Sequence, residues 1–140
     1  MTAAFSSRFY AGRTIHVQSF NCLSVALRLG FGVTVEKNIV LEGVQRISVP
    51  KELRRRAHHA LVVVVGGKNL IVQVGSDEEK DGNVVGRVFL NERVHGKPEG
   101  LVLPRGLEQP VLEVSTFFAW LGEKDFDLRV VKAALNGKGV

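Results

Sequence analysis

Four cations within six residues form the clearest chemical signal in this sequence. Lys51, Arg54, Arg55 and Arg56 stand near the start of a segment with helical spacing. Cations at the start of a helix face the positive end of its dipole, which mildly destabilises the helix and suggests another reason for their presence. Two interpretations stay open for this cluster: a solvated surface, or a contact with phosphate groups or an acidic protein surface.

Positive charge is concentrated in the first half of the chain. The formal net charge is +5. Residues 1–67 carry nine Lys and Arg against three Asp and Glu, whereas residues 68–140 carry ten against eleven. A basic half attracts phosphate or an acidic partner, and aromatic side chains beside a basic groove can stack on single-stranded bases. The candidate binding residues are Lys51, Arg54, Arg55, Arg56, Arg46, Arg87, Phe20 and Phe31, with Tyr10 and Phe89 as further aromatic candidates.

The other reactive side chains do not form a recognisable site. His58 and His59 are adjacent, so on a helix they point about 100° apart and do not make the i, i+4 pair of a metal site. His16 and His95 are remote in the sequence. Cys22 has no basic neighbour, which favours a small buried role over a nucleophile. We therefore expect no metal and no cofactor.

Alternation of apolar and polar residues predicts several half-buried strands. Tight turns would join the first three strands into an antiparallel meander. Residues 1–12 are expected to be weakly ordered, with Phe9 and Tyr10 against the body, and residues 94–103 to be irregular because Gly and Pro interrupt them. The predicted strands cover residues 14–18, 23–29, 33–44, 70–74 and 84–90.

A helix is expected over residues 50–65, where apolar residues recur at helical spacing. Ser48 is the predicted N-cap, Pro50 suits the first turn, and Gly66 with Gly67 ends the helix. We expect this helix to plug the open end of a small β-structure. Its apolar stripe consists of Leu53, Ala57, Leu61 and Val64.

Two helices are expected after Pro110. Ser115 is the predicted cap of the first, which carries Phe117, Phe118 and Trp120 as core residues or a docking patch. Asp125 is the predicted cap of the second, which Gly137 ends. The buried face of the second consists of Phe126, Val130, Ala134 and Leu135.

Length and composition indicate one intracellular domain. A chain of 140 residues can bury a substantial core. One cysteine excludes an intramolecular disulfide and suits a reducing compartment. No apolar run reaches the roughly 18–20 residues of a membrane span, and the N-terminus lacks the apolar core of a signal peptide. We therefore expect a cytoplasmic protein without a membrane partner.

The order of these elements and three local sequences resemble the staphylococcal-nuclease (thermonuclease) family. Residues 17–23, VQSFNCL, stand where the family has V-x-D-G-D-T-V. Residues 40–48, VLEGVQRIS, stand where it has R-L-x-G-V-D-x-P-E. Residues 81–90, DGNVVGRVFL, resemble its Y-G-R-x-L-A-x-V-Y-L. The resemblance implies a small α+β fold: an OB-like five-stranded β-barrel over residues 14–103 with a helix after strand three, and a C-terminal helical region over 111–137. Together they would form a single domain over residues 1–140.

The same alignment implies that the family's calcium-dependent phosphodiesterase site is degenerate. The two metal-binding aspartates fall on Asn21 and Gln45, and the general-base glutamate falls on Ser48. The two phosphate-binding arginines fall on Val40 and Asn83. Since losing one preorganised charge donor removes roughly 3–4 kcal/mol of transition-state stabilisation, these five changes predict that the chain is not an enzyme.

The expected function is therefore that of a catalytically inactive thermonuclease-like module that binds nucleic acid, whether single- or double-stranded DNA or RNA. Binding would use the barrel face and the Arg54–Arg56 side. The alternative is a protein-interaction or assembly protein, such as a phage virion component or an inhibitor of a host machine. A nuclease with an altered active site ranks third. Compact nuclease-like domains occur in phage genomes, so the resemblance also implies a phage origin, and with it the host cytoplasm or the virion.

Overall fold

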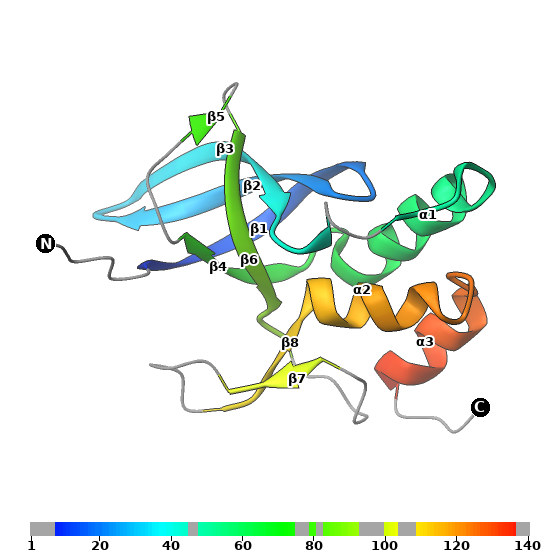
Figure 1. The fold of residues 1–140 in the computed structure, drawn as a ribbon. Helices are drawn as coiled ribbons and strands as arrows, with labels where there is room; N and C mark the ends of the chain where they lie inside the picture. The colour runs from blue at the N-terminus through cyan, green and yellow to red at the C-terminus, as the bar shows by residue number, and fades with distance from the viewer. Residues whose placement is uncertain are drawn as a thin grey trace, which may run out of the picture.

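The computed structural model describes residues 8–44, 48–74, 79–80, 83–92, 100–103 and 109–136. Within these ranges the chain forms a closed five-stranded mixed β-barrel with three α-helices beside it (Figure 1). This architecture confirms the predicted fold class, a small α+β protein built on an OB-like barrel with C-terminal helices.

The barrel closes through one parallel pair of strands. Its strands are β1 (Arg8–Ser19), β2 (Cys22–Gly30), β3 (Val33–Leu41), β4 (Asn69–Val74) and β6 (Asn83–Leu90). They neighbour one another in the order β1-β2-β3-β6-β4 and back to β1. Only β3 and β6 run parallel, with Val40 opposite Val85. A five-stranded barrel of this kind, with a helix between its third and fourth strands, has OB-like topology.

Strict alternation along the strands fills the barrel. Leu23, Val25 and Leu27 of β2 point inward and are at most 5% exposed. β4 alternates in the same way, and both strands were predicted from this period of two. The small strand β5 (Glu79–Lys80) pairs with the start of β6.

The prediction that residues 8–12 are weakly ordered is wrong. They form the first half of β1 and pair with β4, with Arg8 opposite Val74. Gly12 allows the close approach of β2, because a Cβ there would lie 2.8 Å from Cγ1 of Val25. The predicted packing of Phe9 is confirmed, since its ring lies 6.4 Å from that of Phe89.

The central helix forms as predicted but begins differently. A 3₁₀ turn, η2 (Lys51–Leu53), leads into α1 (Arg54–Val65). Ser48 does not cap it: the Leu53 N–H bonds the carbonyl of Pro50 at 2.9 Å, and neither helix start has a side-chain cap. The buried face consists of Ala57, Ala60, Leu61, Val64 and Val65.

α1 lies at the end of the barrel that carries the β1–β2 turn (Figure 1). Nε2 of His58 lies 2.9 Å from the carbonyl oxygen of Val17 in β1, within hydrogen-bond distance. The buried residues of α1 belong to the same core as the inward residues of the barrel. The helix thus closes this end of the core, as expected.

The C-terminal part adds a strand pair and two helices. β7 (Leu101–Val102) pairs with β8 (Val111–Glu113), which in turn pairs with β6. β7 falls in a segment that was expected to be irregular. α2 (Val114–Gly122) and α3 (Leu128–Asn136) follow. None of the helices in the described ranges is long and apolar enough to cross a membrane.

Both predicted caps of these helices are wrong. The Ser115 hydroxyl donates instead to the carbonyl oxygen of Glu42 at 2.6 Å and so ties α2 to the end of β3. The cap of α3 is Asp127, whose Oδ1 accepts from the Arg129 N–H at 2.9 Å. Because α3 begins two residues later than expected, Val131 is its fully buried residue, and Val130, Ala134 and Leu135 are partly buried. Gly137 lies outside the described residues.

Candidate functional site

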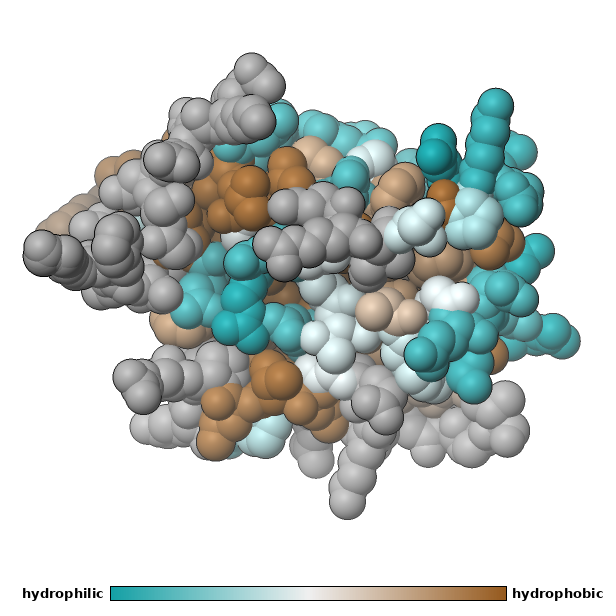
Figure 2. Space-filling model, in the orientation of Figure 1, coloured by the Kyte–Doolittle hydropathy of each residue, from teal (hydrophilic) through white to brown (hydrophobic). Residues whose placement is uncertain are grey.

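The predicted cations gather on one exposed surface at the start of α1. Lys51 lies on η2, and Arg54, Arg55 and Arg56 form the first turn of α1. All four side chains are exposed. Figure 2 shows hydrophilic side chains over the end of the molecule where α1 and α3 lie. We call these four residues the basic surface.

Consecutive positions on a helix point about 100° apart, so the three arginines face different neighbours. Nε of Arg54 donates to the carbonyl oxygen of Val49 at 3.4 Å. Nη1 of Arg56 donates to the carbonyl oxygen of Asp125 at 3.2 Å, which links α1 to the connection between α2 and α3. Arg55 and Lys51 have no side-chain hydrogen bond or ion pair with any residue that the structure describes. Their charges are therefore available to a partner.

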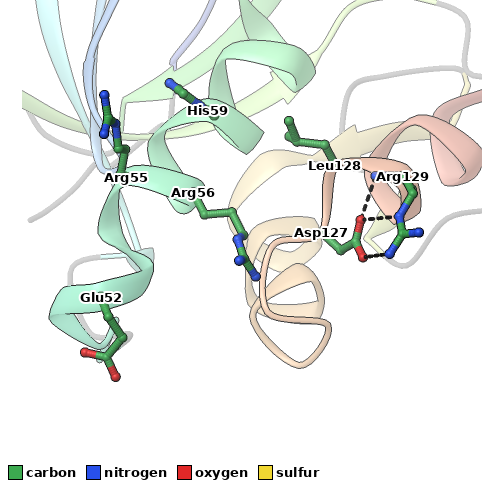
Figure 3. A pocket seen from close by; sticks show the side chains of 7 residues that line it. All are labelled: Glu52, Arg55, Arg56, His59, Asp127, Leu128 and Arg129. Atoms are coloured by element: carbon green, nitrogen blue, oxygen red, sulfur yellow. Dashed lines mark hydrogen bonds and ion pairs between the residues drawn. The ribbon is translucent and has the colours of Figure 1, made fainter.

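An open depression of about 670 Å³ lies between the starts of α1 and α3 (Figure 3). Its polar side chains come from two segments about 70 residues apart in the sequence. Arg56 points toward α3, whereas Glu52 points away from the other labelled side chains. The lining residues are Glu52, Arg55, Arg56, His59, Asp127, Leu128 and Arg129.

The two carboxylates of the depression do not neutralise its α1 side. Asp127 is engaged by Arg129 through two side-chain bonds, at 3.3 Å from Nε and 3.0 Å from Nη2. The side-chain and backbone hydrogen bonds from Arg129 hold the pKa of the Asp127 carboxyl below its ordinary value of 3.8. Residues 51–59 carry four cations against one carboxylate, Glu52. The site as a whole favours an anion such as phosphate.

The contribution of α3 to the depression was not predicted from the sequence. His59 was considered only as a metal ligand, and Asp127 and Arg129 were not singled out. The one available signal was Asp127 itself, since Asp is a favoured residue at the N-cap of a helix. Nothing in the sequence placed this start beside α1.

Arg87 is held away from the basic surface. Its Nε donates to Oε2 of Glu113 at 2.6 Å, and Nη1 donates to Oε1 of Gln73 at 3.3 Å. The guanidinium also lies 5.1 Å from the Phe89 ring centroid. It lines a second depression of about 490 Å³ with Glu42, Gly43, Glu113, Ser115, Thr116 and Ala119. A phosphate would have to compete with Glu113 for this arginine, so its prediction as a binding residue loses support.

The aromatic candidates do not form a stacking platform beside the cations. Phe20 is partly buried, with its ring stacked 6.3 Å from that of Phe118. Phe89 is fully buried, so its prediction as a stacking residue is wrong. Phe31 is fully exposed, but it lies at the β2–β3 turn, at the opposite end of the molecule from α1 (Figure 1).

Three positions aligned with thermonuclease active-site residues lie on different segments of the barrel: Asn21 in the β1–β2 turn, Val40 on β3 and Asn83 at the start of β6. The carbonyl oxygen of Asn21 accepts from the Leu41 N–H at 2.9 Å. Val40 pairs with Val85, two residues beyond the Asn38–Asn83 pair. Of the other two, Ser48 is exposed on the segment before η2. Gln45 lies outside the described residues, as does the predicted binding residue Arg46.

The outer face of β2 and β3, where OB-fold proteins often bind their ligands, is polar but carries little charge. Nε2 of Gln18 donates to Oγ of Ser24 at 2.7 Å and to Oδ1 of Asn38 at 2.9 Å. Sγ of Cys22 lies 3.4 Å from Oε1 of Gln18. Burial raises the pKa of the Cys22 thiol, and the side chain is partly buried, where a small buried role was predicted. The barrel face and the basic surface are thus distinct.

Comparison with known proteins found no matching family model and no significant match among curated proteins. The resemblance to the thermonuclease family therefore stays a prediction from the sequence.

Proposed function

We propose that this chain is a non-catalytic, thermonuclease-like OB-barrel module that binds nucleic acid through phosphate contacts on its basic surface. The observation that carries the proposal is that Lys51 and Arg55 have no side-chain partner among the residues that the structure describes, and that Arg55 lines an open depression with more cations than carboxylates. A phosphate backbone meeting several such side chains releases counterions, which is the main source of non-specific affinity.

The geometry supports a particular mode of binding. Base stacking needs exposed aromatic side chains along the same groove as the cations. Phe20 is packed on Phe118, and Phe31 lies at the other end of the barrel. The module would therefore recognise phosphates rather than bases. It would bind double-stranded DNA at least as tightly as single strands, because a duplex presents the higher charge density.

The uncharged family positions support a role without catalysis. Asn21 and Asn83 offer neutral amides where the family has a metal-binding carboxylate and an arginine, and Val40 offers no polar group. Calcium sites and phosphate transition states both depend on such charges. Binding would accordingly be independent of calcium and would leave the strands intact.

The test is fluorescence anisotropy of labelled single- and double-stranded DNA of equal length. Each titration is run with calcium and with a chelator, and the strands are examined on a gel afterwards. The test variant carries Lys51→Gln and Arg55→Gln, which should not disturb the fold because neither side chain has a partner among the described residues. We expect calcium-independent binding that the variant weakens by about tenfold or more.

A matched control separates the site from net charge. Arg13→Gln with Arg28→Gln also removes two exposed cations, but from β1 and β2. We expect this variant to bind nearly as tightly as the wild-type chain. If both variants lowered the DNA affinity equally, binding would depend on net charge and not on the basic surface. Absence of binding at low salt, or cleavage of the strands, would refute the proposal.

A further inference from the structure

The depression between the starts of α1 and α3 has two walls of different character (Figure 3). Its α1 wall carries Arg55, Arg56 and His59, and its α3 wall carries Asp127 and Arg129. Arg55 and His59 are four residues apart on α1, so they lie one above the other on the same face of the helix. The volume of about 670 Å³ falls within the range of small-ligand sites, which is about 300–1,000 Å³. The depression is therefore large enough for a small ligand.

Arg56 is held in place at the edge of this depression. Its Nη1 donates to the carbonyl oxygen of Asp125 at 3.2 Å, whereas the Asp125 side chain does not line the depression. Asp125 and Phe126 both adopt a φ of +54°, a strained conformation that is anchored by the buried Phe126 ring, 4.8 Å from the ring of Phe118. The guanidinium has no other hydrogen bond with a described residue, so its remaining N–H groups are available to a ligand.

Neither carboxylate of the depression blocks its α1 wall. Both oxygens of Asp127 accept from Arg129, Oδ1 from the backbone N–H at 2.9 Å and Oδ2 from Nη2 at 3.0 Å. Arg129 thus offsets the charge of Asp127. Glu52 points away from the other labelled side chains (Figure 3), and His59 is exposed and makes no hydrogen bond with a described residue. On the α1 side two arginines stand against a single carboxylate, so positive charge remains for a ligand.

A phosphomonoester fits this arrangement better than an internal phosphodiester. A phosphomonoester carries about −1.5 to −2 charges near pH 7 and three acceptor oxygens, whereas a phosphodiester within a strand carries a single charge. The two arginines of the α1 wall can each make paired hydrogen bonds to such a group, and His59 adds a ring nitrogen beside them. A group with a single charge would satisfy one arginine and leave the other without an anion.

We propose that the depression binds the phosphorylated end of a nucleic-acid strand, with the terminal phosphomonoester on Arg55 and Arg56. This rests on the proposed function and adds to it a preference for one kind of strand. The terminal sugar and base would lie toward Leu128, which is half-buried in the same depression. The phosphates that follow would meet Lys51 on η2.

The test compares unlabelled single strands of one sequence as competitors of an internally fluorescein-labelled strand. The competitors carry a 5′-phosphate, a 3′-phosphate, or hydroxyl groups at both ends, and displacement is followed by anisotropy at one salt concentration. We expect a phosphorylated strand to bind at least about tenfold more tightly than the hydroxyl strand, because hydrogen bonds to a charged group are the stronger ones.

A free nucleotide separates the phosphate group from the strand that carries it. Thymidine 5′-monophosphate is titrated into the ¹⁵N-labelled chain, with thymidine as its control. We expect the nucleotide to shift the amide signals of residues 55–59 and 127–129 at millimolar concentration, and thymidine to leave them unchanged. The nucleotide should compete more weakly than the phosphorylated strand, because it lacks the further phosphates that meet Lys51.

Variants on α1 separate the depression from the rest of the basic surface. Arg56→Lys keeps the charge but loses the paired donors, and His59→Ala alters an exposed side chain. Each should lower the preference for the phosphorylated end to about threefold or less. The matched control is Arg54→Gln, which removes a neighbouring arginine that does not line the depression. It should weaken all three strands alike and leave the preference unchanged.

Three outcomes would overturn the inference. Equal affinity for the three strands would do so and leave the proposed function standing, whereas absence of binding by every strand would refute both. A preference that Arg56→Lys and His59→Ala leave unchanged would show that the phosphorylated end binds elsewhere. Competition by thymidine 5′-monophosphate as strong as that of the phosphorylated strand would assign the depression to free nucleotides instead of strand ends.

Discussion

Replacing Phe118 with alanine should destabilise the whole chain. Phe118 lies on α2 and is 1% exposed. Its ring lies 6.3 Å from that of Phe20, at the β1–β2 turn, and 4.8 Å from that of Phe126, in the connection to α3. This side chain therefore joins the barrel to both C-terminal helices.

The expected loss follows from burial. Removing a fully buried phenylalanine ring typically lowers the free energy of unfolding by about 3–5 kcal/mol, and aromatic pairs contribute roughly 0.5–1.5 kcal/mol each beyond burial. Phe118→Leu, which keeps much of the apolar volume, should lose about 1–2 kcal/mol. Phe31→Ala, at a fully exposed position, should change the free energy by no more than about 0.5 kcal/mol.

Urea denaturation followed by far-ultraviolet circular dichroism measures these differences. The fluorescence of Trp120, which stacks 5.7 Å from Phe117, reports on α2 independently. Coincident transitions would show that barrel and helices unfold together. The reasoning would be refuted if Phe118→Ala lost no more stability than Phe31→Ala, or if the fluorescence transition preceded that of the circular dichroism.

Three further predictions concern a cap, a glycine and a strained turn. Because the pKa of Asp127 is lowered in the folded chain, its carboxylate stabilises the fold above pH 3.8 and this contribution is lost as the pH falls through the lower folded value. The stability difference between wild type and Asp127→Asn, read from thermal denaturation across pH, should therefore shrink in acid; a difference that grows would contradict the assignment. Gly12→Ala should lower the free energy of unfolding by about 1–3 kcal/mol in urea, since the new Cβ would lie 2.8 Å from Val25; an unchanged midpoint would argue against the close approach of β1 and β2. Phe31→Asn should raise the free energy of unfolding by up to about 1 kcal/mol, because Asn tolerates the φ of +54° at this position better than Phe does; a lower free energy of unfolding would show that Phe31 is a structural residue.

The barrel could be predicted because its signals are local. Leu23, Val25 and Leu27 alternate with small and polar residues, and glycines mark the next turn. The helix over residues 54–65 also had a clear apolar stripe. These patterns fix which face is buried without knowledge of the neighbour.

The predictions that failed depended on contacts between distant segments. The alternation along β6 places Phe89 on the outer face of the barrel, where an exposed side chain is expected. Phe9 and β8 cover it in the folded chain. The sequence around Arg87 gives no sign of a partner for its charge. The partner in the folded chain is Glu113, which lies 26 residues later in the sequence. The predictions of Ser115 and Asp125 as helix caps are wrong because both helices begin elsewhere. α2 begins before Ser115, at Val114, and α3 begins at Leu128, two residues later than expected.

The candidate site likewise has a part that local sequence predicts and a part that depends on contacts between distant segments. The four cations of the basic surface were evident from the sequence, since they are neighbours along the chain. Arg129 and Asp127 could not be placed with them, because packing between α1 and α3 is set by tertiary contacts about 70 residues apart. Neither could the sequence show that Phe31 and the cations lie at opposite ends of the molecule.

The most direct test of the proposed function is the salt dependence of binding to double-stranded DNA. The logarithm of the binding constant is plotted against the logarithm of the salt concentration for the wild-type chain, for Lys51→Gln with Arg55→Gln, and for the control at Arg13 and Arg28. Each lost phosphate contact lowers the slope by about 0.9, so the test variant should lose about 1.8 and the control almost nothing. Identical slopes for all three proteins would contradict phosphate binding by the basic surface.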